Sequence, residues 1–374
     1  MKKLLIISDT SMYFSSEGRG RAFGPVVREM PTFTQIFDEI IWIGYLDKTN
    51  YGAHVMLDVP HNVKIIPLKS VGGKTLFDKI SVMYALPRIL NVILKELKLV
   101  QHIHSRGPSV PALLALGLSF IFKSKVWWHK YAGNWNEIAP PLSYRAQRFL
   151  LKKLKNTHVT INGFWPKQPK HCISFENPCL TEEQLQMGSQ VLQQKKFEPP
   201  FNFLFIGRLE DAKGVGLIIE AIRKIDKSLL NVVKFIGDGP KRAEYEQRTQ
   251  DLNYVTFLGG LGNDIIHEEL KQTDFLLLPS VASEGFPKVI AEAACYGVVP
   301  IVSDVGSISH YIKANNGFIC DSVNIVHTFE IQLHNALKTE SIQLKQKSIQ
   351  VSEIARLFTF NAYLDKLQHH IFAR

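Results

Sequence analysis

The sequence has few cysteines and no long apolar segment, and both absences narrow the class of protein. Only four cysteines occur among 374 residues, none in CxxC spacing: Cys172, Cys179, Cys295 and Cys320. Neither a disulfide scaffold nor a thiol zinc site is expected, and a reducing cytoplasm is the expected compartment. The longest apolar stretch, 110–122, contains Pro111 and is shorter than the ~20 residues that a bilayer span needs.

Acidic residues are scarce in the first half of the chain. Residues 1–180 hold 24 Lys and Arg against 11 Asp and Glu, whereas 181–374 hold 20 against 23. This asymmetry predicts that the first half meets an anionic partner. Because zinc-ligand, RNA-binding-strand and basic-zipper patterns are missing, nucleic acid is not expected. A membrane surface and a phosphorylated substrate both remain open.

Short apolar runs alternate with helical periodicity in both halves. Strands are predicted at 4–8, 40–44, 63–68, 100–104, 126–131, 159–162, 201–206, 232–236, 255–258, 275–278 and 300–302. Helices are predicted near 25–37, 76–98, 109–121, 142–155, 214–224, 241–250, 263–271, 287–296 and 306–313, with a helical tail after 326. The opening, MKKLLIISDTS, is interpreted as the first strand, because its apolar run is short for a signal peptide. The alternation predicts parallel sheets built from βαβ units.

A glutamine- and charge-rich stretch ending in KKFEPP separates the two α/β halves. We therefore predict two Rossmann-like domains. The predicted boundaries are 1–185 for the first domain, 186–200 for a linker, 201–357 for the second domain and 358–374 for a final helix.

Five consecutive strands of the second half end in Gly, Pro or Ser. These ends are Gly207-Arg208, Gly237–Pro240, Gly259-Gly260, Pro279-Ser280 and Ser303-Asp304. Ligands of open parallel sheets bind outside the carboxyl ends of the strands, and glycine lets a backbone approach a ligand closely. The alternative is a series of ordinary βα turns, which are also short and rich in glycine.

The sharpest motif is EGFPKVIAEAACYG at 284–297. Pro287 suits the first turn of a helix and Gly297 its exit. The amides at this helix start would hold a phosphate; they belong to Gly285, Phe286, Lys288 and Val289. Glu284 and Glu292 flank that position, and carboxylates near a phosphate favour neutral hydroxyls as partners. The outline is that of a sugar–diphosphate–ribose ligand, although each glutamate alone also fits an ordinary helix start or a solvated face.

Two cations follow the strand at 201–206, in the segment GRLEDAKG. Arg208 and Lys213 could stabilise the charge that develops on a departing diphosphate, at ~1.5–3 kcal/mol each. Standing alone, the segment would be interpreted as a solvated loop.

Together, GRLxxxKG, GDGP and EGFPKVIAEAACYGVVPIVSD, spread over 201–321, resemble the retaining glycosyltransferases of family 4. The resemblance implies the GT-B fold, in which two Rossmann-like domains face each other across a cleft. It also implies sugar transfer from a nucleotide-sugar donor with retained anomeric configuration, and neither a catalytic metal nor a cofactor.

The resemblance assigns roles to individual residues. Arg208 and Lys213 would hold the diphosphate, Glu284 would contact sugar hydroxyls and Glu292 the ribose. The remaining donor-binding candidates are Gly207, Gly237, Asp238 and Gly239, near the nucleobase, and Gly285, Phe286, Pro287, Lys288 and Val289 at the helix start. The family's last helix crosses back to the first domain, which is the expectation for 358–374.

The first half carries weaker motifs. Family members often place a His at the end of the strand predicted at 126–131, but this chain reads WWHKYAGNW there. His129 is early and is expected to pack, so Lys130 or Tyr131 is the expected substitute. Further candidates for sugar or acceptor contacts are Gly18, Gly20, Arg106, Gly133 and Asn134.

The helix predicted at 142–155 carries five cations beside a stripe of leucine and phenylalanine. The stripe is expected to face the core and the cations water. The alternative is docking on an anionic leaflet where a lipid-linked acceptor would wait.

The leading hypothesis is a hexosyl- or N-acetylhexosaminyltransferase that acts on a glycan or lipid-linked acceptor in cell-surface polysaccharide synthesis. We expect it in the cytoplasm, and peripheral docking on the inner face of the membrane is the alternative that the basic first half leaves open. Two alternatives remain: a GT-B nucleotide-sugar epimerase and a non-catalytic nucleotide-sugar-binding module.

Overall fold

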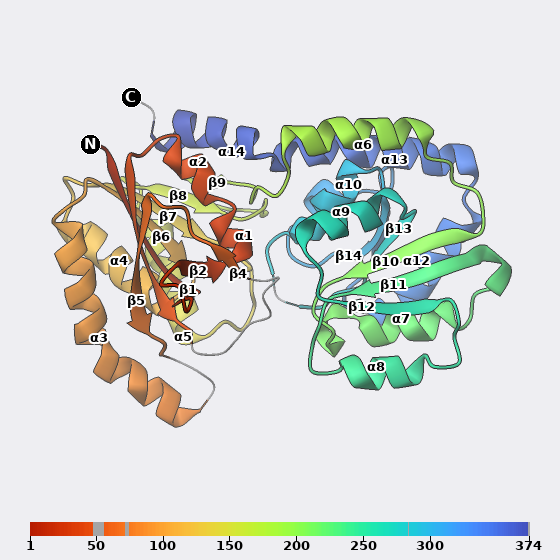
Figure 1. Ribbon diagram of the computed structural model, residues 1–374, viewed down its shortest axis with the longest axis horizontal. Coiled ribbons are helices and arrows are strands. Elements are labelled where there is room, and N and C mark those ends of the chain that lie inside the picture. Colours follow the sequence, from red (N-terminus) through yellow and green to blue (C-terminus); the bar gives the residue numbers. More distant parts are fainter. Residues whose placement is uncertain (48–55, 72–74, 283, 373–374) are drawn as a thin grey trace. The chain divides into compact units, whose positions relative to one another are not determined.

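The computed structural model describes residues 1–47, 56–71, 75–282 and 284–372, which form two compact α/β units (Figure 1). Unit 1 comprises Met1–Phe175 and Tyr363–Arg374, and unit 2 comprises Glu176–Ala362. The chain therefore passes between the units twice, and the segment that ends it belongs to unit 1. The predicted fold class, two Rossmann-like parallel-sheet domains, is confirmed.

Unit 1 is built on a mostly parallel sheet. Its strands are β1 (Lys3–Phe14), β2 (Gly20–Phe23), β3 (Glu39–Leu46), β4 (Met56–Asp58), β5 (Val63–Lys69), β6 (His102–Gly107), β7 (Val126–Tyr131), β8 (His158–Ile161) and β9 (Cys172–Ser174). Parallel pairing gives the order β5-β3-β1-β6-β7-β8-β9, while β2 pairs antiparallel with the end of β1 and with β4. The chain order reverses between β1 and β6, which makes that position a switch point where ligands can bind.

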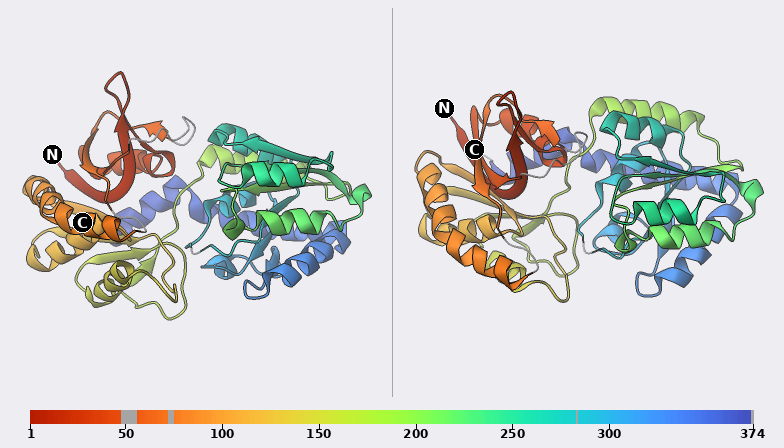
Figure 2. Two further views of the ribbon diagram at one scale, coloured as in Figure 1. Left: turned by 90° about the horizontal axis from the view of Figure 1, so that it is seen from below. Right: turned by 60° about the horizontal axis from the view of Figure 1, so that its bottom comes forward.

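Helices cover both faces of this sheet (Figure 2). They are α1 (Gly24–Val27), α2 (Met30–Thr34), α3 (Leu76–Leu97), α4 (Val110–Ile121), α5 (Leu142–Lys153), α14 (Phe360–Lys366) and the π-helical turn Leu367–Ile371. Alternate residues of β1 point to opposite faces. Leu4 packs in a core with Phe33 of α2 and Tyr363 of α14, whereas Leu5 packs in a core with Ile89 of α3.

Unit 2 has a fully parallel sheet of six strands. These are β10 (Phe201–Ile206), β11 (Leu230–Ile236), β12 (Val255–Gly259), β13 (Phe275–Leu278), β14 (Val299–Ser303) and β15 (Phe318–Cys320), in the order β12-β11-β10-β13-β14-β15. This is the strand order of a doubly wound Rossmann sheet, with its switch point between β10 and β13.

The helices of unit 2 form two layers (Figure 1). One layer holds α6 (Glu182–Gln194), α9 (Asn263–Lys271), α10 (Lys288–Cys295) and α13 (Ser341–Ala355), and the other holds α7 (Val215–Ile222), α8 (Arg242–Arg248) and α12 (Ile325–Lys338). Short pieces complete the unit: α11 (Ile308–Tyr311) and the 3₁₀ turns Asp211–Lys213, Lys227–Leu229 and Arg356–Phe358.

Several elements differ from the sequence prediction. Most of the predicted linker, 186–200, lies in helix α6, which Thr181 and Gln184 start with a reciprocal capping box and which packs on α10 and α13. The helix predicted at 25–37 is two short helices, each with a proline in its first turn. The short strands β2, β4, β9 and β15 were not predicted, because three or four residues give too little periodicity to detect.

The absences noted in the sequence have structural counterparts. All four cysteines are free thiols in the interior, and burial raises the pKa of Cys295 and of Cys320 to about 12. The Cys295 and Cys320 thiols are therefore protonated and unreactive at neutral pH. Within the described ranges, no helix combines the length and the apolar character that a membrane crossing requires.

Candidate active site

Two of the predicted catalytic residues meet at the switch point of unit 2. Lys213 ends the 3₁₀ turn that follows β10, and Glu284 lies in the loop that follows β13. The Lys213 Nζ lies 2.7 Å from Glu284 Oε1, and the two side chains are 19% and 27% exposed. Residues 71 positions apart thus form an ion pair within reach of solvent, at the place where the topology of the sheet favours a ligand.

Backbone contacts hold these two loops together. The amide of Val281 donates to Ala212 O at 2.8 Å, and the Ser280 hydroxyl donates to the same carbonyl at 3.3 Å. Gly214 follows with a left-handed φ of 79°, and a Cβ there would lie 2.3 Å from Pro279 O. Only glycine allows this approach, so Gly214 fixes the position of Lys213 against the second loop.

A third loop, after β14, packs against the backbone of Glu284 and Gly285. Gly306 has a left-handed φ of 66°, and a Cβ there would lie 2.4 Å from Glu284 O. The amide of Ser307 donates to Gly285 O at 3.0 Å, and the buried Ser303 hydroxyl donates to Ser280 O. Ser303 was expected at a strand end near the ligand, whereas Gly306 was not singled out from the sequence, because its supporting role depends on a contact between distant loops.

The amino end of α10 lies immediately after Glu284. Pro287 is the N-cap residue and its side chain makes no hydrogen bond to the helix; the first amides of α10, at the positive end of the helix dipole, are those of Lys288 and Val289. Phe286 is 5% exposed and stacks on Phe358 at 4.9 Å. Its side chain anchors the turn in the core, and only its backbone remains for a ligand. Glu292 is half-buried on the next turn of α10.

Arg208 lies on a neighbouring loop and faces solvent. Its side chain is 65% exposed, with Nε 3.0 Å from Glu210 Oε2. The loop is held against the predicted nucleobase segment, because the Leu209 amide donates to Asp238 O at 3.0 Å and the Lys241 amide donates to Leu209 O at 3.2 Å. The structure thus places Gly207, Gly237, Asp238 and Gly239 along one edge of the loop that carries Arg208.

Unit 1 has a cavity of about 530 Å³ at its own switch point. Strand β1, the end of β6 and the loops after β6 and β7 supply most of its lining, which comprises Asp9, Thr10, Ser11, Phe23, Val26, Arg106, Gly107, Pro108, Ala132, Gly133 and Tyr144. Arg106 and Gly133 were predicted as contacts, whereas Tyr144 was not. Burial raises the pKa of Asp9, although Arg106 partly opposes this shift. The lining mixes apolar rings with a few hydrogen-bonding groups.

Beneath this cavity lies a buried network of charges. Glu29 is 1% exposed and accepts two hydrogen bonds from Arg106, at 2.6 and 3.2 Å. The Lys130 Nζ lies 3.4 Å from both Glu29 Oε2 and the hydroxyl of Tyr363. Because Lys130 is fully buried, its ammonium supports the interior of unit 1.

Tyr131 and His129 are buried as well. Tyr131 is 1% exposed, and burial raises its pKa to about 12. Both side chains are thus buried, and the expectation that Lys130 or Tyr131 replaces the family's sugar-contacting residue stays a prediction. His129 Nδ1 lies 2.7 Å from Ser105 Oγ, and burial lowers the pKa of His129 to about 3. This histidine packs in the core, as expected.

The remaining candidates of unit 1 lie outside the residues that line the cavity. Gly18 occupies the turn between β1 and β2 with φ 73°, and Gly20 begins β2. Asn134 accepts a hydrogen bond at Oδ1 from the Asn136 amide at 3.0 Å and so shapes its own loop.

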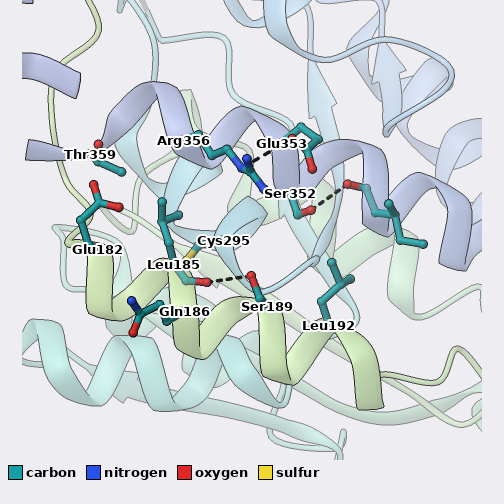
Figure 3. Close-up of a pocket in the computed structure, with 11 residues that line it drawn as sticks. Glu182, Leu185, Gln186, Ser189, Leu192, Cys295, Ser352, Glu353, Arg356 and Thr359 are labelled. Atoms are coloured by element: carbon teal, nitrogen blue, oxygen red, sulfur yellow. Dashed lines mark hydrogen bonds and ion pairs between the residues drawn. The ribbon is translucent and has the colours of Figure 1, made fainter. Parts of the chain in front are cut away.

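A second cavity, of about 380 Å³, lies in unit 2 between α6 and α13 (Figure 3). Predicted site residues do not line it. The interactions drawn there run along a single helix or its end, as between Ser189 and Leu185 or between Arg356 and Glu353. Separately, across the described residues no group of three His, Cys, Asp or Glu is placed to hold a metal ion.

Comparisons with known proteins place part of the chain in a family of similar sequences. The family model "Glycosyl transferases group 1" matches residues 190–349. An uncharacterized glycosyltransferase of Methanocaldococcus jannaschii is 32% identical over 131 residues, which is 34% of this chain and 36% of that protein. An α-1,4-N-acetyl-D-galactosaminyltransferase of Campylobacter jejuni, whose name specifies a PP-undecaprenol-linked glycan, is 34% identical over 131 residues, or 34% of each chain. The chain thus spans about a third of the length of these relatives.

Solved structures extend the likeness to the whole fold. Anabaena HepE, crystallised in complex with UDP, matches with a TM-score of 0.66 at 14% identity, and the match covers 100% of both chains. At this identity the match shows a similar fold and nothing more. Residues 190–349 therefore form a domain of the glycosyl transferases group 1 family, within a chain that has the GT-B fold.

Proposed function

We propose that the protein transfers a sugar from a nucleoside-diphosphate donor to a hydroxyl of an acceptor, with retention at the anomeric carbon and without a catalytic metal. One observation carries the proposal. Lys213 and Glu284 form a solvent-accessible ion pair directly beside the uncapped amino end of α10, at the switch point of unit 2. One loop cluster thereby contains a helix amino end suited to an anion, the Lys213 ammonium, and the Glu284 carboxylate, which can accept hydrogen bonds from hydroxyl groups.

Each part has a role in the reaction. The donor's diphosphate would lie against the amides of Lys288 and Val289, with Lys213 and Arg208 as cationic partners. When the bond between the anomeric carbon and the phosphate oxygen breaks, the departing diphosphate gains negative charge, which these groups stabilise. Glu284 would accept hydrogen bonds from sugar hydroxyls and orient the reacting carbon. Retention requires the acceptor oxygen to arrive on the face from which the diphosphate leaves.

We place the acceptor in the cavity of unit 1 and propose a glycan or a lipid-linked glycan of cell-surface polysaccharide synthesis. Apolar walls from Phe23 and Pro108, together with the polar groups of Asp9 and Tyr144, suit the alternating faces of a sugar ring. The Campylobacter relative, with its PP-undecaprenol-linked glycan, supports the lipid-linked form. A transferred hexose or N-acetylhexosamine fits this acceptor class.

The proposal is tested first with a panel of nucleotide sugars and their nucleoside diphosphates in thermal-shift measurements. Donors that stabilise the protein then enter reactions with and without glycan acceptors, and mass spectrometry follows donor and product. The proposal requires donor binding, a product that depends on the acceptor, the same anomeric configuration in donor and product, and unchanged activity in EDTA. Conversion of the donor without an acceptor would instead identify an epimerase.

A further inference from the structure

Helix α5 of unit 1 exposes a face that combines large apolar side chains with cations. Its exposed residues are Leu142, Arg145, Ala146, Phe149, Lys152 and Lys153. At about 100° per residue these six fall within an arc of about 120°. Leu142 is 82% exposed and Phe149 60%, so the arc contains two uncovered apolar side chains, three cations and no acid.

The surroundings extend the same character. Ile138, four residues before the helix, is 100% exposed. The whole stretch 101–175 holds eleven Lys and Arg but a single acidic residue, Glu137. Isolated exposed apolar side chains are common on proteins, but three of them beside cations in a region nearly free of acids form a coherent surface.

The exposed residues of α5 differ from those that the sequence predicted. Arg148 is 9% exposed and donates to Trp135 O at 2.6 Å and to Glu137 O at 3.0 Å, so it holds the preceding loop in place. Leu142 and Phe149, in contrast, leave the core and lie among the cations. The leucine and phenylalanine stripe that was expected to face inward is therefore divided, with Leu151 buried and Phe149 outside.

We propose that this α5 face, defined by Ile138, Leu142, Arg145, Phe149, Lys152 and Lys153, docks reversibly on an anionic lipid bilayer. The three apolar side chains would enter the headgroup region, while the three cations would meet lipid phosphates. Charge complementarity and exposed apolar side chains together favour a bilayer. The inference rests on the exposed face alone and not on the donor site, so either can fail without the other.

Flotation of the intact protein with lipid vesicles tests the proposal. Vesicles of phosphatidylcholine alone are compared with an equal mixture of phosphatidylcholine and phosphatidylglycerol, at low salt and at about 1 M salt, where the Debye length falls to about 3 Å. The wild-type protein should float with the anionic vesicles at low salt only. Absence of binding to them at low salt would overturn the proposal.

Charge reversal identifies the face that binds. R145E/K152E/K153E should lower the vesicle partition coefficient by about 100-fold or more, since each cation near an anionic leaflet contributes roughly fivefold. The matched control K196E/K227E/K338E changes the net charge equally on exposed positions of unit 2 and should bind almost as wild type does. Equal losses in both variants would show a net-charge effect and overturn the assignment to α5.

An apolar variant separates insertion from simple attraction between charges. L142S/F149S should weaken binding at each salt concentration at which the wild-type protein binds, while leaving the salt dependence of binding unchanged. Thermal shift with the nucleoside diphosphate that binds best should be the same in all of these variants as in wild type. If L142S/F149S binds anionic vesicles as well as the wild-type protein does, docking by this face is contradicted. A variant whose binding differs from wild type only in its salt dependence would contradict it as well.

Discussion

Each unit places charged side chains at the switch point of a parallel sheet, but the two sets of charges face different surroundings. In unit 2, Lys213 and Glu284 are about a quarter exposed and Arg208 is two-thirds exposed. In unit 1, Glu29 and Lys130 are buried, and Arg106 is 11% exposed and bound to Glu29. Pairs near solvent exchange partners at low cost, whereas a buried pair that loses one member leaves a charge without compensation. The charges of unit 2 are thus available to a ligand, and those of unit 1 hold the fold together.

The largest expected effect is on the stability of unit 1. Glu29→Gln should lower the free energy of unfolding by about 3–5 kcal/mol, because Arg106 and Lys130 then share a buried site without a carboxylate. Glu39→Gln, which breaks an ion pair with Lys3 that is about one-third exposed, is the control and should cost less than about 1 kcal/mol. Urea unfolding of both variants measures the difference. If both variants lose the same free energy of unfolding, the claim that the buried charges of unit 1 hold its fold together is contradicted.

The next effect is on catalysis by unit 2. Arg208→Ala and Lys213→Met should each lower kcat and kcat/KM together by about 100-fold or more, because the two cations act most strongly as the diphosphate departs. Lys224→Met removes another exposed cation of unit 2, paired with Glu330, and should leave the kinetics unchanged. Turnover close to wild type in both site variants would exclude these residues from the reaction.

Acid should destabilise unit 1 through its buried histidines. Burial lowers the pKa of His129 to about 3 and that of His104 well below its usual value. The unfolded chain therefore binds more protons than the folded chain below about pH 6.5, and stability is lost as the pH falls from there toward 3. Each histidine contributes a slope of up to about 1.4 kcal/mol per pH unit.

Urea unfolding at a series of pH values measures this slope. His129→Asn removes one titrating group and keeps a polar atom for Ser105, so the slope should decrease by about one histidine's share. A slope that is the same in this variant and in wild type would mean that His129 does not titrate on unfolding.

The smallest expected effect distinguishes the two glutamates of unit 2. Glu284→Gln should lower kcat by about tenfold, because Glu284 orients the sugar at the reacting carbon. Glu292→Gln should instead raise the KM for the donor with little change in kcat, because a ribose contact is equal in ground and transition states. Steady-state kinetics with the donor varied separates the two results, and the opposite pattern would exchange the two roles.

The success of prediction from sequence also differs between the units. The strands at 126–131, 201–206 and 275–278 have the predicted bounds, because buried parallel strands are continuous apolar runs. Lys213 and Glu284, which the structure brings together, could be chosen as candidates from the sequence because a motif with fixed spacing carries them.

Glu29 was missed, because a glutamate in a helical segment resembles a surface residue until Arg106 and Lys130 are seen to surround it. For a similar reason the sequence predicted an exposed Arg148 and a buried Phe149, whereas Arg148 is buried and Phe149 is exposed. Helical periodicity gives the direction of a side chain, but the depth to which neighbouring segments bury it depends on tertiary packing.

Amide hydrogen exchange with and without a nucleoside diphosphate tests the central claim, that the donor binds at the switch point of unit 2. With whichever of UDP, GDP and ADP gives the largest thermal shift, protection should increase in segments 207–214, 237–240 and 284–292, and it should be lost in Lys213→Met. Protection confined to the cavity of unit 1, or to the cavity between α6 and α13, would contradict the account.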